Sequence, residues 1–337
     1  KAIKEQWEQG GVRSMIDFMK GVVGPCIIEV STENEVFFFA SCASGGFYWT
    51  QIKDRETNNF PKGETAILTA VEKDYGEQFI EPSKQFMERL TTLTAGHKQK
   101  EFDTAFEIAN HVKDICNELN IHYIFKASYK KANRSKLDSF TGIGDVEALE
   151  MIKKIGQDLS IDTITDIHES HEAEEVSTYV NHLQIPAFLC RQTSLLIAAG
   201  KTGLPVNVKK GQFMSHESMQ FAIEKIQSTG NKNAWVCERG NSFGYQDLIV
   251  DATSIYKLKK HQVPVIMDCT HAVQKPNQTS GVTGGDPSLI EAISLNAAAT
   301  GADGLFIETH PNPSKAKSDP HTMLALDKLY PILKKVV

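Results

Sequence analysis

Positively charged side chains follow several apolar stretches of the sequence. They are Lys126, Lys131 and Arg134 in FKASYKKANRS (125–135), Lys209 and Lys210 in VNVKKG (206–211), and Arg239 in CERG (237–240). Any one of these lysines alone is most simply a solvated surface charge, but a lysine in an apolar setting such as IFKAS loses hydration energy. Gathered together, the six charges would repel one another unless an anion neutralised them, and ammonium and guanidinium groups suit phosphate and carboxylate oxygens. The set predicts one or two phosphorylated substrates.

A second set of residues could bind a divalent metal ion. It consists of Cys26 in GPC, His271 in CTH, Glu308 in ETHP and Asp319 in KSDPH. A thiolate, an imidazole and two carboxylates suit Zn²⁺, Fe²⁺ or Mn²⁺. Their wide separation in the sequence has no motif value, however, and a lone cysteine is more often a small buried apolar residue. The spacing by itself leaves both interpretations open.

Two more polar groups follow apolar stretches. One group contains Asp166, His168 and Glu169. Its side chains could align a sugar hydroxyl, hydrogen-bond to a residue that binds the metal, or accept hydrogen bonds from backbone amides of the loop. Gln184 and Arg191 flank an apolar turn, where Arg191 could bind phosphate or a helix C-terminal carbonyl. The residue types leave each choice open.

The stretches that end in these residues alternate with helical patterns. Eight short apolar, β-branched runs predict strands, at 22–29, 121–128, 162–169, 182–188, 206–211, 234–240, 263–271 and 304–311. Apolar residues spaced three and four apart predict helices at 103–119, 145–159, 171–180, 193–202, 216–228, 247–261, 287–301 and 322–336. Near-continuous apolar strands joined by helices are typical of a parallel sheet buried on both faces.

Eight βα units predict an α/β protein with a (β/α)8 TIM-barrel fold. In such a barrel the C-terminal ends of the strands converge on one pocket, so the polar residues above would meet there. An open, doubly wound sheet is the alternative, but the first predicted strand lacks the G-x-G-x-x-G turn of a dinucleotide site.

The link between the first two predicted strands is unusually long, at roughly 70 residues, for a loop in a compact domain. We expect residues 1–29 to form the N-terminal segment and first barrel strand, 30–101 an insertion, and 102–337 the rest of the barrel. The insertion contains the aromatic-rich stretch VFFFASCASGGFYWTQI (36–52). It is interpreted as a lid-like or interface subdomain; the alternative is a misassembled or engineered segment.

Composition narrows the possible partners and location. Acidic residues outnumber basic ones, 42 to 36, giving a formal charge of −6, which argues against a nucleic-acid partner. No stretch is long and apolar enough to predict a membrane span, and the first 20 residues carry charges throughout, unlike a secretory signal. The six cysteines include no CxxC pair, which predicts reduced thiols in a cytoplasmic protein.

Several motifs together resemble the 3-deoxy-D-manno-octulosonate 8-phosphate synthase family. They are GPCIIE, FKASYKKANRS, TDIHE, QIPAFLCRQT, VNVKKGQF, CERGNSFGYQDLIVD, DCTHAVQ, SGVTGG and GLFIETHPNP. The resemblance covers 20–29 and about 102–337 in the same order, and KANRS, QIPAF and ETHP distinguish it from the related 3-deoxy-heptulosonate 7-phosphate synthases. It implies a cytoplasmic homotetrameric transferase of lipopolysaccharide Kdo biosynthesis, which condenses phosphoenolpyruvate with D-arabinose 5-phosphate and water and releases inorganic phosphate.

The resemblance also implies a role for each motif residue. A cradle for phosphoenolpyruvate would consist of Lys126, Ser128, Lys131, Gln184, Lys209 and Arg239. Contacts to arabinose 5-phosphate would come from Asn133, Arg134, Ser135 and Arg191, with Asp166 as a further substrate contact. The metal-dependent class of the family has Cys26, His271, Glu308 and Asp319 as ligands of Zn, Fe or Mn. Catalytic roles would fall to His271, Asp319, Lys131 and Asn133.

Three positions depart from the family pattern. Asp286 stands where the family usually has Arg, Ser194 where it usually has Asp, and Pro320 with His321 replaces a small-residue loop. These changes leave two rival functions open. One is a related synthase that accepts another aldehyde, and the other is a catalytically weakened barrel used for binding or assembly.

Overall fold

The computed structural model describes residues 8, 99, 101–132, 143–276, 278, 283–316 and 320–337, together with the backbone of three strands between residues 26 and 53. The chain divides into two compact units. One comprises Lys1–Asp103 with Thr141–Gly144, and the other comprises Thr104–Phe140 with Asp145–Val337.

The second, larger unit is built on a parallel sheet of seven strands. They are β4 (Ile124–Lys126), β5 (Asp162–Asp166), β6 (His182–Ile185), β7 (Val206–Lys209), β8 (Ala234–Glu238), β11 (Val265–Asp268) and β14 (Gly304–Phe306). Their order in the sheet follows their order in the chain, and every pairing is parallel. A doubly wound sheet would reverse its strand order part-way, so this alternative is wrong.

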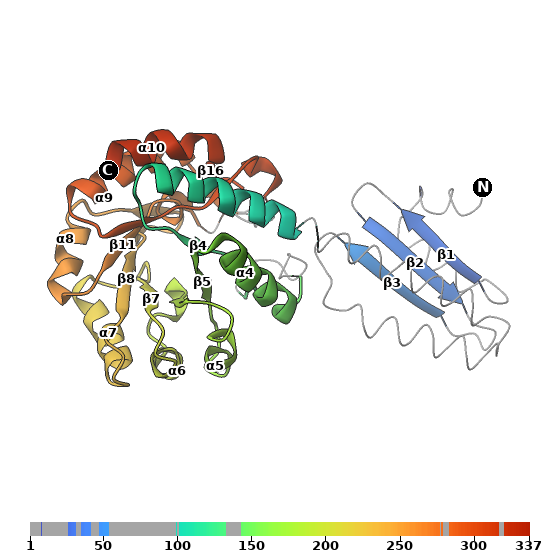
Figure 1. Ribbon diagram of the computed structural model, residues 1–337, viewed down its shortest axis with the longest axis horizontal. Coiled ribbons are helices and arrows are strands. Elements are labelled where there is room, and N and C mark those ends of the chain that lie inside the picture. The colour runs from blue at the N-terminus through green and yellow to red at the C-terminus, as the bar shows by residue number, and fades with distance from the viewer. Residues whose placement is uncertain are drawn as a thin grey trace. The chain divides into compact units, whose positions relative to one another are not determined.

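The sheet curls until its outer strands approach each other. A flat sheet of seven strands would place the two edge strands roughly 29 Å apart, at about 4.8 Å per neighbour. Instead, the Lys126 ammonium on β4 lies 5.9 Å from the centre of the Phe306 ring on β14. Outside the sheet, the hydroxyl of Tyr330 donates a hydrogen bond of 2.5 Å to Glu118, which joins the helix at 101–118 to the last helix (Figure 1). The described residues therefore form a curled parallel half-barrel.

Helices cover the outer face of this sheet. They are the helix at 101–118, α4 (Asp145–Leu159), α5 (Glu172–Val176), α6 (Thr193–Lys201), α7 (Gln220–Gln227), α8 (Ser254–Leu258), α9 (Ile290–Ala299) and α10 (Leu329–Val336). In α4 the spacing of apolar residues predicted the helix with the same ends, and Leu149, Ile152 and Ile155 are the buried face. All four residues of β6 and of β7 are buried, because helices cover the side of these strands that faces away from the barrel interior.

Two of the predicted helices begin seven residues later than expected, because short strand pairs take their first residues. The pattern at 247–261 yields α8 only from Ser254, since β10 (Asp247–Ile249) pairs antiparallel with β9 (Asn241–Phe243) around Gly244, whose φ is +63°. The pattern at 322–336 yields α10 only from Leu329, since β16 (Leu324–Ala325) pairs with β15 (Thr309–His310). A third pair joins β12 (Gln274–Lys275) to β13 (Gly284–Gly285).

The first unit contains a separate antiparallel sheet of β1 (Cys26–Ser31), β2 (Glu35–Ser41) and β3 (Phe47–Lys53). The links between them have three and five residues, which is too short for a parallel crossover. This differs from the prediction that 22–29 forms the first barrel strand: Cys26–Ser31 pairs with β2, since a strand-forming run so near in the sequence costs little loop entropy to reach. Most of the predicted insertion at 30–101 lies outside the described residues, so the domain division stays a prediction.

Within the described part of the chain, no helix combines the length and the apolar character needed to span a bilayer.

The core beneath α4 gives a test of this packing. Replacing Ile155, which is 1% exposed, with alanine should lower the free energy of unfolding by about 2–5 kcal/mol, because it leaves a cavity between α4 and the sheet. Val146 lies on the same helix but is 50% exposed, so Val146→Ala should change it by less than about 0.5 kcal/mol. Urea denaturation followed by circular dichroism measures both, and equal losses would contradict the placement of α4.

Candidate active site

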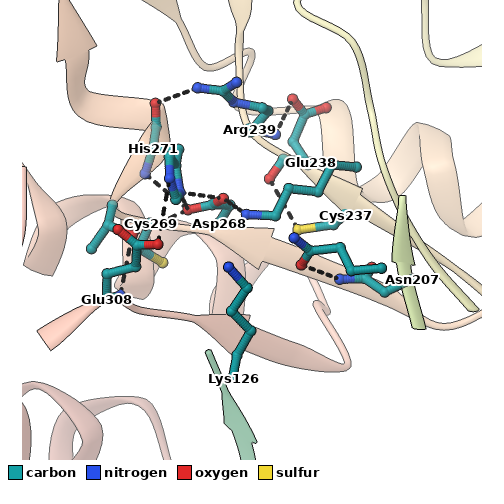
Figure 2. Close-up of polar contacts among 12 residues, drawn as sticks. Lys126, Asn207, Cys237, Glu238, Arg239, Asp268, Cys269, His271 and Glu308 are labelled. Carbon is teal, nitrogen blue, oxygen red and sulfur yellow. Dashed lines mark hydrogen bonds and ion pairs between the residues drawn. The ribbon is translucent and has the colours of Figure 1, made fainter. Parts of the chain in front are cut away.

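The C-terminal strand ends bring charged residues of both signs into one buried cluster. Figure 2 shows Lys126, Asp268 and the side chains that follow β8, β11 and β14 converging from separate strands. Lys126, Lys209, Arg239, His271 and Glu308 were all predicted to meet here, and the structure brings them together. The prediction did not include Asp268, which contacts both Lys209 and His271.

Asp268, the last residue of β11, lies at the centre of this cluster and is fully buried. Its Oδ1 accepts hydrogen bonds from the backbone N–H of His271 at 2.8 Å and from the Thr270 hydroxyl at 3.2 Å. Its Oδ2 accepts one from the Lys209 ammonium and lies 2.8 Å from His271 Nδ1 (Figure 2). Burial opposes the charge on Asp268, but His271 and Lys209 outweigh it and hold the pKa of Asp268 well below its ordinary value.

His271 and Glu308 form a pair suited to a cation. His271 Nε2 lies 3.6 Å from Glu308 Oε1, and the backbone N–H of Glu308 donates to the Thr270 hydroxyl. Burial would raise the pKa of Glu308, but the nearby charges of His271 and Lys131 lower it to about 2. The second carboxylate oxygen of Glu308 is buried and accepts no hydrogen bond from the described residues. A bound cation is one explanation for such an oxygen.

The contact with Asp268 also prepares His271 to bind a metal. An imidazole whose Nδ1–H donates to a carboxylate keeps the lone pair of Nε2 free, and Nε2 is the nitrogen that faces Glu308. The side chain of Cys26 and the whole of Asp319 lie outside the described residues. Among the residues that the structure does describe, no three His, Cys, Asp or Glu side chains form a metal site. The metal therefore stays a prediction.

A second buried network lies at the ends of β4 and β5. The Lys126 ammonium donates to the Ser128 hydroxyl at 2.7 Å and lies 3.3 Å from Asp166 Oδ1. The other oxygen of Asp166 lies 3.1 Å from His168 Nε2. Burial opposes charge on both Lys126 and Asp166. Even so, Asp166 and Glu308 hold the pKa of Lys126 above its ordinary value, and Lys126 and His168 hold that of Asp166 well below.

Glu172, in the first turn of α5, anchors the loop after β5. Its Oε2 accepts from the backbone N–H groups of His168 at 2.7 Å and Glu169 at 3.1 Å, and Lys130 lies 3.4 Å from Oε1. Sequence reasoning missed this residue, although a glutamate in a first helical turn four residues after His168 is a capping signal. Glu169, weighed as a sugar contact, contributes its backbone to this cap.

Arg239 and Gln184 each contact a side-chain amide. Arg239 donates to the His271 carbonyl and to Gln274 Oε1. Gln184 accepts from the Asn207 amide at 3.4 Å inside the sheet. Lys131 is close enough to Asp166 and Glu308 to lower the pKa of both carboxylates, so it belongs to the same cluster.

Lys210 does not lie at the barrel mouth, and that expectation is corrected here. Successive strand residues point to opposite faces, so Lys209 enters the cluster and Lys210 faces away from it. Its side chain is fully buried, donates to Asn241 Oδ1 at 2.7 Å, and lies 3.3 Å from Glu238 Oε1. Glu238 in turn accepts from the backbone N–H groups of Arg239 and Gly240. Lys210 therefore stabilises the turn that presents Arg239 rather than binding substrate.

The predicted arabinose 5-phosphate contacts are only partly described. Arg191 is exposed on the turn after β6, and no contact among the described residues joins it to Lys209 or Arg239. Asn133, Arg134 and Ser135 lie outside the described residues.

The departures from the family pattern lie in two turns and in the first turn of a helix. Asp286 accepts hydrogen bonds from the backbone N–H and hydroxyl of Ser288, which lower its pKa, so its carboxylate caps the turn before α9. Gly285 packs so closely against the turn at 320–322 that an added Cβ would lie 2.3 Å from Thr322 Cγ2. Ser194 is exposed in the first turn of α6.

Comparison with known proteins places the chain in a family. The family model described as "DAHP synthetase I family" matches residues 95–337, which is well over half of the chain. The chain belongs to the DAHP synthetase I family. Among similar family proteins, three bear the name 2-dehydro-3-deoxyphosphooctonate aldolase. That of Fusobacterium nucleatum is 46% identical over 228 residues, covering 68% of this chain and 82% of that protein.

The other two are similarly close. The protein of Francisella tularensis subsp. holarctica is 44% identical over 215 residues, covering 64% of this chain and 78% of that protein. That of Desulfotalea psychrophila is 44% identical over 231 residues, covering 68% and 82%. These relatives confirm the resemblance drawn from the sequence motifs at the level of the enzyme family.

The Lys210–Glu238 pair can be tested through stability. Lys210→Met leaves Glu238, which is 1% exposed, with the His216 ring 3.5 Å from its other oxygen but without the Lys210 ammonium, and should lower the free energy of unfolding by about 3 kcal/mol. In Lys210→Met/Glu238→Gln the amide oxygen still accepts from Arg239 and Gly240, so part of the loss should be recovered. Chemical denaturation measures both variants. A double variant less stable than the single one would contradict this role.

The buried Asp166 predicts a loss of stability in acid. Its pKa is lower in the folded protein than the value of about 3.9 in an unfolded chain, so its charge stabilises the fold above that value. This contribution is lost as the pH falls below about 4 and through the folded-state pKa. Unfolding free energies of wild type and Asp166→Asn, measured from pH 6 to pH 2, should therefore converge in acid; a gap that widens on acidification would disprove the assignment.

Proposed function

We propose that the chain is a 3-deoxy-D-manno-octulosonate 8-phosphate synthase of lipopolysaccharide Kdo biosynthesis. It condenses phosphoenolpyruvate with D-arabinose 5-phosphate and water, and releases inorganic phosphate. The observation that carries the proposal is the convergence of Lys126, Lys209 and Arg239 in a buried cluster, in a chain 46% identical to a protein named for this activity. The family resemblance supports a cytoplasmic homotetramer.

The proposal includes an eight-stranded (β/α)8 barrel. The helix at 101–118 precedes β4 and already contacts α10, so one further strand before this helix would complete the eighth βα unit. The close approach of Lys126 to Phe306 supports closure, since a flat sheet would separate β4 from β14 widely.

The cluster's chemistry suits an anionic enol substrate. Lys126, Lys209 and Arg239 would bind the phosphate and carboxylate of phosphoenolpyruvate, with Ser128, Lys131 and Gln184 completing the cradle. Fixed charges hold C3 against the aldehyde carbon of the second substrate, which converts a bimolecular encounter into a directed one. Asn133, Arg134, Ser135 and Arg191 are proposed to bind the phosphosugar, with Asp166 facing its hydroxyls.

The reaction then proceeds in three steps. C3 of phosphoenolpyruvate forms a bond to the aldehyde carbon, and the aldehyde oxygen takes a proton. Water adds to C2 and gives up a proton, and the resulting hemiketal phosphate loses inorganic phosphate to leave the C2 keto group. His271, Asp319, Lys131 and Asn133 are proposed to hold or move these protons.

The residues present fit a divalent metal. The imidazole of His271 is oriented by Asp268, and Glu308 has a buried oxygen with no hydrogen bond from the described residues. With Cys26 and Asp319 they would hold Zn²⁺, Fe²⁺ or Mn²⁺. When bound, such an ion supplies a Lewis acid that polarises the aldehyde or orients water.

The test measures phosphate release from phosphoenolpyruvate with a panel of phosphosugars, with and without a metal chelator. We expect turnover only with arabinose 5-phosphate, because the cradle and sugar contacts follow that family pattern. Turnover with a different aldehyde would instead support a related synthase, and no turnover with any metal would support a binding or assembly protein.

The chelated sample tests the metal separately from the substrate. Chelation should abolish turnover, and Cys26→Ala should lose both most turnover and the response to added metal, since a ligand is missing. Full activity after chelation would overturn the metal proposal while leaving the substrate assignment intact.

A further inference from the structure

One carboxylate serves both halves of the site. Asp268 accepts a hydrogen bond from Lys209, which belongs to the proposed phosphoenolpyruvate cradle, and contacts the Nδ1 of His271, which belongs to the proposed metal set. Figure 2 shows the Asp268 side chain beside that of His271. Within the part of the chain that the structure describes, no other carboxylate contacts both.

Asp268 has little freedom to leave this position. It is fully buried, and its Oδ1 is held by the His271 backbone N–H and the Thr270 hydroxyl. That same hydroxyl accepts from the backbone N–H of Glu308, so the end of β14 is tied to the end of β11. The carboxylate is therefore fixed to both strand ends that present the proposed metal ligands.

Lys209 and His271 also share a neighbouring ring. The Lys209 ammonium lies 3.6 Å from the centre of the Phe306 ring, and the His271 ring centre lies 5.8 Å from it at 45°. The ring limits where either group can move, while Asp268 provides the charge that both contact. If the hydrogen bond of one of them to Asp268 becomes stronger, the interaction of the other with Asp268 must change as well.

We propose that Asp268 is a positioning residue that couples phosphoenolpyruvate binding at Lys209 to metal binding at His271. A cation on His271 Nε2 makes the Nδ1–H a stronger donor, so His271 draws more of the charge of Asp268. Lys209 is then less neutralised and binds an anion more tightly. By linkage the anion strengthens metal binding by the same factor. The inference rests on the proposed function of this site.

The test uses Mn²⁺ as the metal and measures its affinity by electron paramagnetic resonance, with and without phosphoenolpyruvate. In wild type, phosphoenolpyruvate should tighten Mn²⁺ binding by a factor in the range of roughly 5 to 150 that is usual for coupled sites. In Asp268→Asn the amide NH₂ cannot accept from Lys209, so the factor should fall to nearly one. Mn²⁺ affinity itself should fall by roughly 10- to 100-fold, as for other partners of metal-bound histidines.

Asp166→Asn is the matched control, because Asp166 is also a buried carboxylate paired with a cradle lysine but has no contact with His271. It leaves Lys126 less neutralised, so it should tighten phosphoenolpyruvate binding while leaving the coupling factor at its wild-type value. Two results overturn the proposal: a wild-type factor of one, or an Asp268→Asn variant with weaker affinities and an unchanged factor.

A second pair of variants tests the idea without altering Asp268. Lys209→Met leaves the Asp268 charge to His271 alone, so Mn²⁺ should bind more tightly in the absence of phosphoenolpyruvate. Lys126→Met removes a nearby positive charge that makes no hydrogen bond to Asp268, and should tighten Mn²⁺ less. If Lys209→Met tightens Mn²⁺ binding no more than Lys126→Met does, the coupling is contradicted. Because no sugar is added, failure of arabinose 5-phosphate as substrate would leave this result unaffected.

Discussion

Charge compensation in a water-poor cluster is the constraint on which the rest of this structure depends. Ammonium groups at Lys126 and Lys209 are buried at strand ends, where an unpaired charge would cost several kcal/mol. Asp166 and Asp268 neutralise them in the absence of substrate. An anionic substrate therefore enters a site whose positive groups are already in position, and needs only to share them with carboxylates that stay in place. Such preorganisation is the main source of electrostatic catalysis.

The alternation of strand side chains separates this cluster from a second one that has a different purpose. Lys209 and Lys210 are adjacent in sequence yet contribute to different networks, as do Glu238 and Arg239. The network on the outer side, built on Glu238, fixes the backbone of the turn at Gly240. Because the outer network already holds this turn, the side chain of Arg239 can contribute to the inner network. Because successive strand residues point to opposite faces, the strand ends present two charged layers. One layer stabilises the turn, and the other faces the proposed substrate.

The sequence predicted the strands of the sheet and most of the cations because both follow from local patterns. The ends of α4 were predicted without error, since apolar spacing and a helical length suffice there. Asp268, Glu172 and Glu238 were missed because a carboxylate pairs with a lysine only when both side chains point to the same face of the sheet or loop. Which residues of neighbouring strands share a face depends on the pairing register of the strands, which the sequence patterns do not give. The strand pair formed by β9 and β10 and the pairing of Cys26–Ser31 with β2 were missed for a related reason. In each of these two segments, an antiparallel pairing between strands close in the sequence competes with the helix or barrel strand that the apolar pattern predicts.

The departures from the family pattern are consistent with this separation between residues that hold turns and residues that face the proposed substrate. Asp286 stands where the family usually has a basic residue, and its carboxylate accepts hydrogen bonds from Ser288 in the cap before α9. Gly285 beside it keeps a role that only a residue without Cβ can fill, because Thr322 and the His321 carbonyl pack against it. Sign changes are tolerated where a side chain ends in a cap, whereas inside the cluster each charge has a partner whose removal would leave another buried charge uncompensated. A change at Asp268 would therefore leave both Lys209 and His271 without the carboxylate that they share.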